Sequence, residues 1–311
     1  MKYKYLIFDA TNLFWRCFTI SLKKSIFELK EQVFLAAIEE FFSKIEKFRS
    51  TYASKSTKFY FLFDNPNSVI NFRKELDENY KSIRSKKDAP AGFYDTLSKA
   101  KEVLKVYSDN FFILTIKGAE ADDSTYPLIK TFEKELDDFN RCLCISADLD
   151  WARNITENID WFNFKEIYNI PNFKEEYNFP PTAEKIKLYK SLHGDISDNI
   201  PNVLSHAPKK IILDILNTYD SLVDLLKDLD QKFKQKKCTK WELRILENRD
   251  AINKNYTLVD FVHLNINLNQ YICKCKYDDY QLKFWSDIFG LKLNNCDLNE
   301  ANFQNAKEFF K

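Results

Sequence analysis

The stretch FFILTIKGAEADDSTYPLIK (residues 111–130) joins a short apolar run to a helical pattern through a cluster of acidic side chains. The apolar run is typical of a buried strand, and the spacing of apolar residues after the cluster is typical of a helix. Glu120, Asp122 and Asp123 lie at the junction. They can cap the helix, because its exposed N–H groups attract negative charge, or they can bind a metal ion. One cluster alone does not decide between these hypotheses.

The same order of strand and helix recurs through the first half of the chain. Strands are predicted at residues 3–9, 58–64, 111–116, 141–146 and 159–164, with helices near 27–49, 95–108 and 122–138. This alternation predicts an α/β fold with a mainly parallel central sheet and helices on both faces. After Pro180–Pro181 the pattern becomes mostly helical. We therefore predict an α/β domain over residues 1–180 and a helical region over 181–311.

Acidic residues follow nearly every predicted strand. Ligands of such sheets bind beyond the carboxyl ends of the strands, so these acids are expected to converge. The set comprises Asp9, Asp64, Glu120, Asp122, Asp123, Asp148 and Asp150, and the stretch SLHGDISDNIPNV (191–203) adds Asp195 and Asp198. Carboxylates gathered in this way repel one another and raise one another's pKa unless cations lie among them. The pattern predicts a site for hard divalent ions such as Mg²⁺, which take oxygen ligands and activate water for phosphodiester cleavage.

Composition limits the other classes of function. The chain has 47 basic and 46 acidic side chains, a net charge of +1, which excludes a uniformly basic surface but allows basic and acidic regions to be segregated. The apolar run near the N-terminus is broken by Asp9 and is too short for a signal peptide or a membrane span. The 7 scattered cysteines favour a reducing compartment. We expect a cytoplasmic protein with no membrane partner.

The order of these acids resembles the 5′-nuclease superfamily, which contains flap endonucleases, polymerase-associated 5′–3′ exonucleases and phage-type ribonuclease H. The segment NYKSIR (79–84) resembles the family's Tyr-Lys-x-x-Arg signature, and NYTLVDF (255–261) is similar to a segment of the phage and bacterial members. The resemblance covers residues 3 to about 265. It implies a PIN-like α/β domain with a helical arch near 80–108, and a helix–three-turn–helix over about 185–217 that binds DNA.

The resemblance also implies a role for each site residue. One group of carboxylates would bind a first Mg²⁺, namely Asp9, Asp64, Glu120 and Asp122. A second group would bind another, namely Asp148, Asp150, Asp195 and Asp198, with Asp123 assisting nearby. Mn²⁺ is expected to substitute for Mg²⁺. Lys81 and Arg84 would contact the scissile phosphate as catalytic residues. The nucleic-acid strand would be contacted by Arg16, Tyr80, Lys86, Lys87, Lys209 and Lys210.

One part of the chain departs from the family pattern. A glycine-rich turn that grips duplex DNA in the family is replaced here by Asn202 and by residues 205–208, which read SHAP. The loss of glycine removes close approach of the backbone, so a bound monovalent ion is not expected in this turn. Duplex contact through Lys209 and Lys210, at a helix N-terminus, stays a hypothesis.

Together these features predict a monomeric, structure-specific 5′-nuclease of a bacterial or phage-infected cell. It would act as a flap endonuclease and 5′–3′ exonuclease, remove RNA primers, and have ribonuclease H activity. Its substrates would be branched or nicked DNA and RNA–DNA hybrids. A sliding clamp or a single-strand-binding protein is a candidate partner, the clamp through the C-terminal NAKEFFK (305–311). The alternative is a non-cleaving DNA-binding protein with a relic metal pocket.

Overall fold

The computed structural model describes residues 2–24, 30–65, 72–82, 89–261 and 266–289. The chain divides into two compact units. The first unit contains residues 1–65, 89–146 and 265–311, and the second contains 66–88 and 147–264. Residues 147–180, which we expected in the α/β domain, thus belong to the second unit. A boundary between independently folding domains near residue 180 stays a prediction.

The sheet of the first unit is mostly parallel. Its strands are β1 (Tyr3–Asp9), β2 (Ala53–Leu62), β3 (Phe111–Leu114), β4 (Cys142–Ile145) and β7 (Ile272–Lys274). They are arranged in the order β4-β1-β2-β3-β7. β1 pairs in parallel with β2 and β4, and β2 pairs in parallel with β3, whereas β7 runs antiparallel to β3. The predicted α/β class with a mainly parallel sheet is confirmed.

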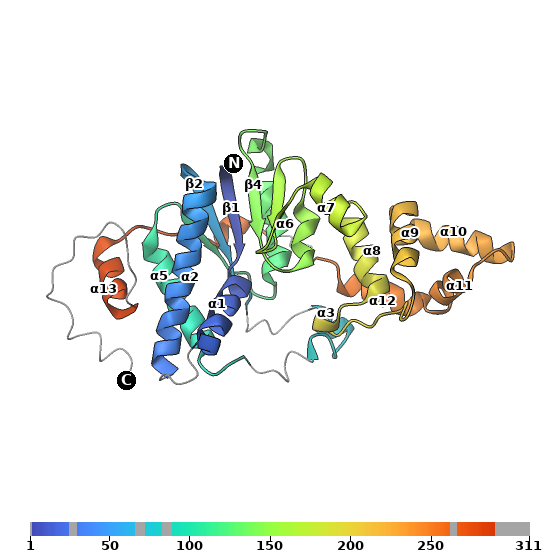
Figure 1. The fold of residues 1–311 in the computed structure, drawn as a ribbon, viewed down its shortest axis with the longest axis horizontal. Helices are drawn as coiled ribbons and strands as arrows, with labels where there is room; N and C mark the ends of the chain where they lie inside the picture. The colour runs from blue at the N-terminus through green and yellow to red at the C-terminus, as the bar shows by residue number, and fades with distance from the viewer. Residues whose placement is uncertain (1, 25–29, 66–71, 83–88, 262–265, 290–311) are drawn as a thin grey trace. The chain divides into compact units, whose positions relative to one another are not determined.

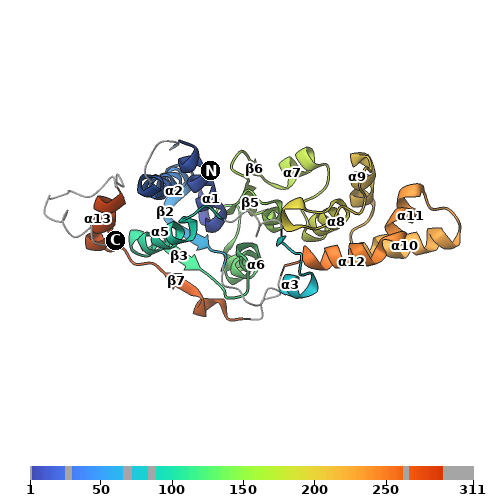
Figure 2. The same cartoon turned by 90° about the horizontal axis from the view of Figure 1, so that it is seen from below.

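Helices cover both faces of this sheet, as is required for strands that are buried along nearly their whole length (Figures 1 and 2). The helices of this unit are α1 (Ala10–Lys24), α2 (Lys30–Tyr52), α5 (Phe93–Tyr107), α6 (Ala121–Phe132) and α13 (Asp279–Phe289), with short 3₁₀ helices η1 (Glu133–Glu135) and η4 (Leu268–Gln270). On one face, the ring of Tyr5 stacks on Phe132 of α6 at 3.9 Å between centroids. On the other face, Phe8 meets Phe48 of α2 edge-on at 5.3 Å.

The second unit is mainly helical. Its helices are α3 (Phe72–Leu76), α7 (Ile170–Tyr177), α8 (Ala183–His193), α9 (Lys209–Thr218), α10 (Leu222–Lys234), α11 (Lys240–Glu247) and α12 (Arg249–Leu258). It also contains the 3₁₀ helices η2 (Leu149–Asn154) and η3 (Ile196–Asp198), and an antiparallel hairpin of β5 (Ile159–Phe162) and β6 (Ile167–Tyr168). Helix α8 packs against α9, α12 and η2, so it is the element around which this unit is assembled.

Two predicted motifs can be compared with these elements. The helix–three-turn–helix predicted over about 185–217 corresponds to α8, η3, the following turns and α9. His206 has a φ of 65° in those turns, the left-handed region that glycine adopts at the least cost. Of the arch predicted near 80–108, residues 93–107 form α5, and residues 83–88 lie outside the described residues. The function of this segment as an arch stays a prediction.

None of the helices within the described ranges combines the length and the apolar character needed to cross a membrane.

An aromatic cluster in the second unit provides a test of its core. Phe173 is fully buried and stacks on Tyr177 at 4.3 Å, with Phe179 edge-on at 5.6 Å. Because the rings pack on several sides, Phe173→Ala should leave a cavity and lower the free energy of unfolding by about 3–5 kcal/mol. Phe139→Ala is the control, since Phe139 is 91% exposed and should change stability by about 0.5 kcal/mol or less. Urea denaturation measures both, and equal effects would contradict the packing described.

Candidate active site

Asp9 lies at the carboxyl end of β1 and is held by two hydrogen bonds. The Ser146 hydroxyl donates to its Oδ2 at 2.8 Å, and the backbone N–H of Asn12 donates to its Oδ1 at 3.0 Å. Ser146 directly follows β4, while Asn12 lies in the first turn of α1. The carboxylate of Asp9 therefore joins the ends of two neighbouring parallel strands and caps a helix.

Asp64 follows β2 and connects it to two helix starts. Its backbone N–H donates to Thr11 Oγ1 at 3.0 Å, and its Oδ1 accepts from the backbone N–H of Ala121 at 2.9 Å. Thr11 belongs to α1, and Ala121 is the first residue of α6. Asp64 thus joins segments that are more than 50 residues away in sequence, whereas the convergence of all the acids on one metal site stays a prediction.

The acids at the start of α6 cap this helix, as one of the two hypotheses proposed. Asp123 Oδ2 accepts from the backbone N–H of Glu120 at 3.0 Å, and Asp122 Oδ1 accepts from that of Asp123 at 2.9 Å. Asp123 is fully buried, whereas Glu120 and Asp122 are half-buried. A carboxylate has about four lone-pair sites, so a hydrogen bond to one oxygen leaves acceptor capacity for a cation. Capping does not exclude metal binding here.

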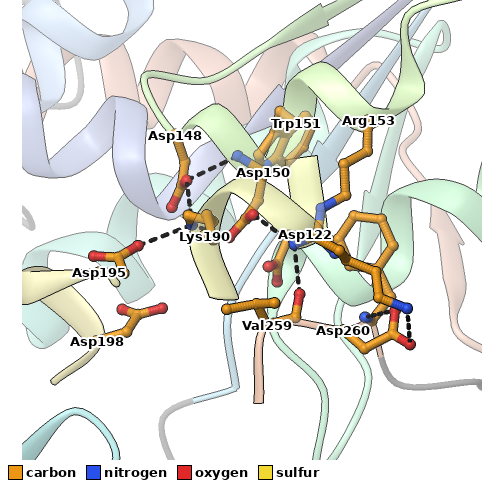
Figure 3. A network of polar contacts seen from close by, with 12 residues as sticks. Asp122, Asp148, Asp150, Trp151, Arg153, Lys190, Asp195, Asp198, Val259 and Asp260 are labelled. Atoms are coloured by element: carbon orange, nitrogen blue, oxygen red, sulfur yellow. Dashed lines mark hydrogen bonds and ion pairs between the residues drawn. The ribbon is translucent and has the colours of Figure 1, made fainter. Parts of the chain in front are cut away.

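The acids of the second unit surround a lysine (Figure 3). Lys190 Nζ on α8 lies 2.6 Å from Asp150 Oδ2, 2.8 Å from Asp195 Oδ2 and 3.8 Å from Asp148 Oδ1. Its side chain is 7% exposed. Asp148 and Asp195 also cap η2 and η3, respectively, by accepting a backbone N–H two residues later. We call Asp148, Asp150 and Asp195 the lysine-centred acids.

Electrostatics keep this cluster ionised. Burial by itself would raise the pKa of Asp150, but the Lys190 ammonium and the Arg153 guanidinium hold it far below the usual range. For Asp195, burial also acts to raise the pKa, and Lys190 lowers it. Burial would lower the pKa of Lys190, but the three surrounding carboxylates raise it. Asp150 and Asp195 are consequently charged beside a charged lysine.

Arg153 connects Asp150 to the end of α12. Its Nη2 donates to Asp150 Oδ1 at 2.8 Å and also to the carbonyl oxygen of Val259. Its guanidinium lies over the ring of Phe261, 4.5 Å from the centroid. The segment NYTLVDF, which resembles the family in sequence, therefore supports one of the acids.

Two more residues hold the end of α12 and its neighbours, which are the last turn of α8 and the segment after η3. Arg73 of α3 donates to the carbonyl oxygens of Leu258 and Asp260 at 2.9 and 2.6 Å. Asn255 donates from its amide to the carbonyl oxygens of Ser191 and Pro201 at 3.0 and 2.9 Å. Sequence reasoning missed Lys190, Arg153 and Arg73, because a buried cation is not recognisable until its partners are known.

Asp198 lies beside the residues of the Tyr-Lys-x-x-Arg segment. Its Oδ2 accepts from the Tyr80 hydroxyl at 3.3 Å, and its Oδ1 lies 3.9 Å from Lys81 Nζ. The backbone N–H of Lys81 also donates to the Asp198 carbonyl oxygen at 3.0 Å. Tyr80 is buried in a cluster with Ile200. Stacking on a base needs an accessible ring, so the expected contact of Tyr80 with the nucleic-acid strand stays a prediction.

The other expected contacts with nucleic acid are placed in part. Arg16 is exposed on α1, and Lys209 and Lys210 are exposed in the first turn of α9. A cavity of about 470 Å³ adjoins this turn, and its lining includes Tyr189, His193, His206 and Lys209. Arg84, Lys86 and Lys87 lie outside the described residues.

The donor chemistry of both groups of acids fits a hard divalent cation, because every side chain offers carboxylate oxygen. As the described side chains stand, no three of the His, Cys, Asp and Glu residues are arranged to hold a metal ion. In the second unit, the ammonium of Lys190 lies among the carboxylates where a metal ion would have to bind. The oxygens of the lysine-centred acids lie 2.6–3.8 Å from an ammonium, whereas Mg²⁺ binds oxygen at about 2.1 Å.

Comparison with known proteins identifies the class to which this fold and these acids belong. Residues 4–178 match the model of the 5′-3′ exonuclease, N-terminal resolvase-like domain. The chain is a member of this family, which confirms the resemblance noted in its sequence.

Among particular relatives, the chain is 26% identical over 266 residues to the flap endonuclease of Escherichia phage T5, covering 82% of each sequence. It is 25% identical over 235 residues to a 5′-3′ exonuclease of Buchnera aphidicola, covering 72% of this chain and 78% of the relative. The crystal structure of the phage T5 D15 protein co-crystallised with metal ions matches the fold with a TM-score of 0.62. It covers 83% of this chain and 89% of the T5 chain, at 24% identity.

Gly194 allows the turn that carries Asp195, and this requirement can be tested. Its φ is 77°, and a Cβ atom there would lie 2.6 Å from the Asn202 nitrogen and 2.7 Å from the Ile200 oxygen. Gly194→Ala should lower the free energy of unfolding by about 1–3 kcal/mol, because both contacts are with backbone that must move. Gly118→Ala, at a φ of 85°, is the control for the conformational cost alone. Urea unfolding of both variants measures the difference, and equal losses would show that close approach at Gly194 costs nothing.

Proposed function

We propose that the chain is a divalent-metal-dependent, structure-specific 5′-nuclease that acts as a flap endonuclease and 5′–3′ exonuclease. Membership of the 5′-3′ exonuclease family supports this proposal. The observation that carries it is that acids far apart in sequence are held close together in each unit. Asp64 accepts a hydrogen bond from the backbone N–H of Ala121, the first residue of α6. Asp148, Asp150 and Asp195 surround Lys190.

In this proposal Asp9, Asp64, Glu120 and Asp122 hold one Mg²⁺, and the lysine-centred acids with Asp198 hold another, with Asp123 as support. When bound, such ions activate water and stabilise the leaving oxygen of a phosphodiester. The hydrogen bonds to backbone N–H groups orient the carboxylates, so that little rearrangement of their backbone is needed. Mn²⁺ is expected to replace Mg²⁺, since both accept oxygen ligands.

Lys81 and Arg84 serve the substrate phosphate in this mechanism. Lys81 Nζ lies 3.9 Å from Asp198 Oδ1, so it supplies positive charge directly beside one of the proposed metal ligands. Positive charge at that position offsets negative charge that develops on the phosphate during cleavage. Arg84 is proposed to contact the same or the adjacent phosphate through its planar guanidinium.

The proposed substrates are nicked or branched DNA and RNA–DNA hybrids with 5′ ends or flaps. One T5 D15 flap endonuclease structure is described as a pseudo-enzyme-product complex with DNA and metal ions, which supports DNA as a ligand class. Exposed Lys209 and Lys210 at the start of α9 offer charge and backbone N–H groups to a duplex phosphate. Arg16, Lys86 and Lys87 are proposed to contact the strand with the 5′ end.

The function is tested with a 5′-labelled flap substrate. Asp195→Asn should lower the cleavage rate at least about 100-fold while flap binding persists, because a ligand of a metal ion is lost. EDTA should abolish cleavage by the wild-type protein, and added Mg²⁺ should restore it. Asp138→Asn is the control, since it removes the same charge from an exposed residue outside the site.

A substrate with an RNA 5′ segment then measures RNA-primer removal and ribonuclease H activity in the same assay. Cleavage by the wild-type protein that continues undiminished in EDTA would refute metal dependence. Metal-independent flap binding without cleavage would favour the alternative, a non-cleaving DNA-binding protein with a relic pocket.

A clamp partner is proposed through the C-terminal NAKEFFK, which lies outside the described residues. Paired phenylalanines in a terminal segment can insert into an apolar groove of a partner. Deletion of residues 303–311 should lower clamp-stimulated cleavage and leave clamp-free cleavage unchanged. Cleavage assays with and without the clamp measure this, and equal loss in both would reject the tether.

A further inference from the structure

Helix α8 carries three lysines that are all buried but have different partners. Lys185 donates to the carbonyl oxygens of Leu216 and Tyr219 at the end of α9. Lys187 forms an ion pair with Asp260 at 2.8 Å. Lys190 alone lies among the lysine-centred acids, two of which are closer than 3 Å to its Nζ. The three lysines are 5–7% exposed, so they are closely matched in burial.

The position of Lys190 reduces the repulsion among three carboxylates of the second unit. Three carboxylates that approach one point repel one another, and burial weakens the screening by water. The ammonium of Lys190 contacts one oxygen of each, and Arg153 contacts only Asp150. Lys190 is therefore a cationic partner that the three carboxylates share.

The same position conflicts with a divalent ion. The metal must approach carboxylate oxygens to about 2.1 Å, and the ammonium already occupies the space that these oxygens face. Two cations at such short separation repel each other, so they cannot share the centre at low cost. The long, flexible stem of lysine allows its charge to move without any movement of α8.

We propose that Lys190 is a tethered counter-ion that holds Asp148, Asp150 and Asp195 together before metal binds and leaves their centre when a divalent ion enters. The inference rests on the proposed function, because it takes these acids as metal ligands. It assigns Lys190 a positioning role with two opposite effects. The lysine stabilises the protein without metal, and it weakens the binding of the ion that replaces it.

Lys190→Met tests both effects, because methionine keeps most of the apolar stem of lysine and removes its charge. Without metal, the thermal midpoint of Lys190→Met should fall below that of the wild type, since the carboxylates lose their cation. Added Mg²⁺ or Mn²⁺ should raise this midpoint more than it raises that of the wild type. The dissociation constant for Mn²⁺ at the second site, measured by titration calorimetry, should fall at least about tenfold.

Lys187→Met is the matched control, on the same helix with the same burial but paired with Asp260. It should lower the midpoint without increasing the response to metal. An unchanged or smaller metal response in Lys190→Met would overturn the proposal, as would an equal gain in Lys187→Met. If Lys190→Met does not fold without metal, recovery of its native circular dichroism on adding Mn²⁺ supports the proposal. Failure to recover contradicts it.

These outcomes are separable from those of the proposed function. Wild-type protein that binds no divalent ion in the calorimeter and does not cleave the flap would remove the nuclease proposal itself. If the wild-type protein binds metal and cleaves the flap, but Lys190→Met binds metal no more tightly than the wild type, only the counter-ion role is contradicted.

Discussion

Repulsion between neighbouring carboxylates is the constraint on which this structure depends. A chain that gathers acids from distant segments must supply each of them with a donor or a cation, or their charges drive the segments apart. In the first unit the donors are mostly backbone N–H groups at helix starts, with the Ser146 hydroxyl at Asp9. In the second unit a lysine and an arginine are also present. Both solutions fix the direction of the carboxylates, and in the second unit the cations also lower the pKa of Asp150 and Asp195.

The buried cations explain why the second unit is organised around α8. The buried lysines of this helix reach the end of α9, Asp260 after α12, and the lysine-centred acids. Arg73 and Arg153 bind carbonyl oxygens at the end of α12, where the helix dipole favours positive charge. The segment NYTLVDF therefore has a structural role. Its carbonyl oxygens accept hydrogen bonds from Arg73 of α3 and from Arg153, which also contacts Asp150.

Helix capping and metal binding are compatible roles for the same acids. Asp9, Asp123, Asp148 and Asp195 each accept a nearby backbone N–H, as the capping hypothesis predicted for the acids around Asp123. The capped oxygen orients the carboxylate, and the remaining lone pairs stay available to a cation. An acid at a helix start beyond a strand is thus preorganised by the N–H groups of the helix.

The sequence by itself determined the α/β class, four of the five strands of the first unit's sheet, and the acids at their carboxyl ends, because these follow from local periodicity and from the geometry of parallel strands. Only the tertiary structure decided the partners of Lys190, the burial of Tyr80 and the antiparallel pairing of β7. A lysine in an amphipathic helix and a three-residue strand have no distinctive local pattern. Their roles arise from residues that folding brings close from distant parts of the chain, and no local rule specifies those contacts.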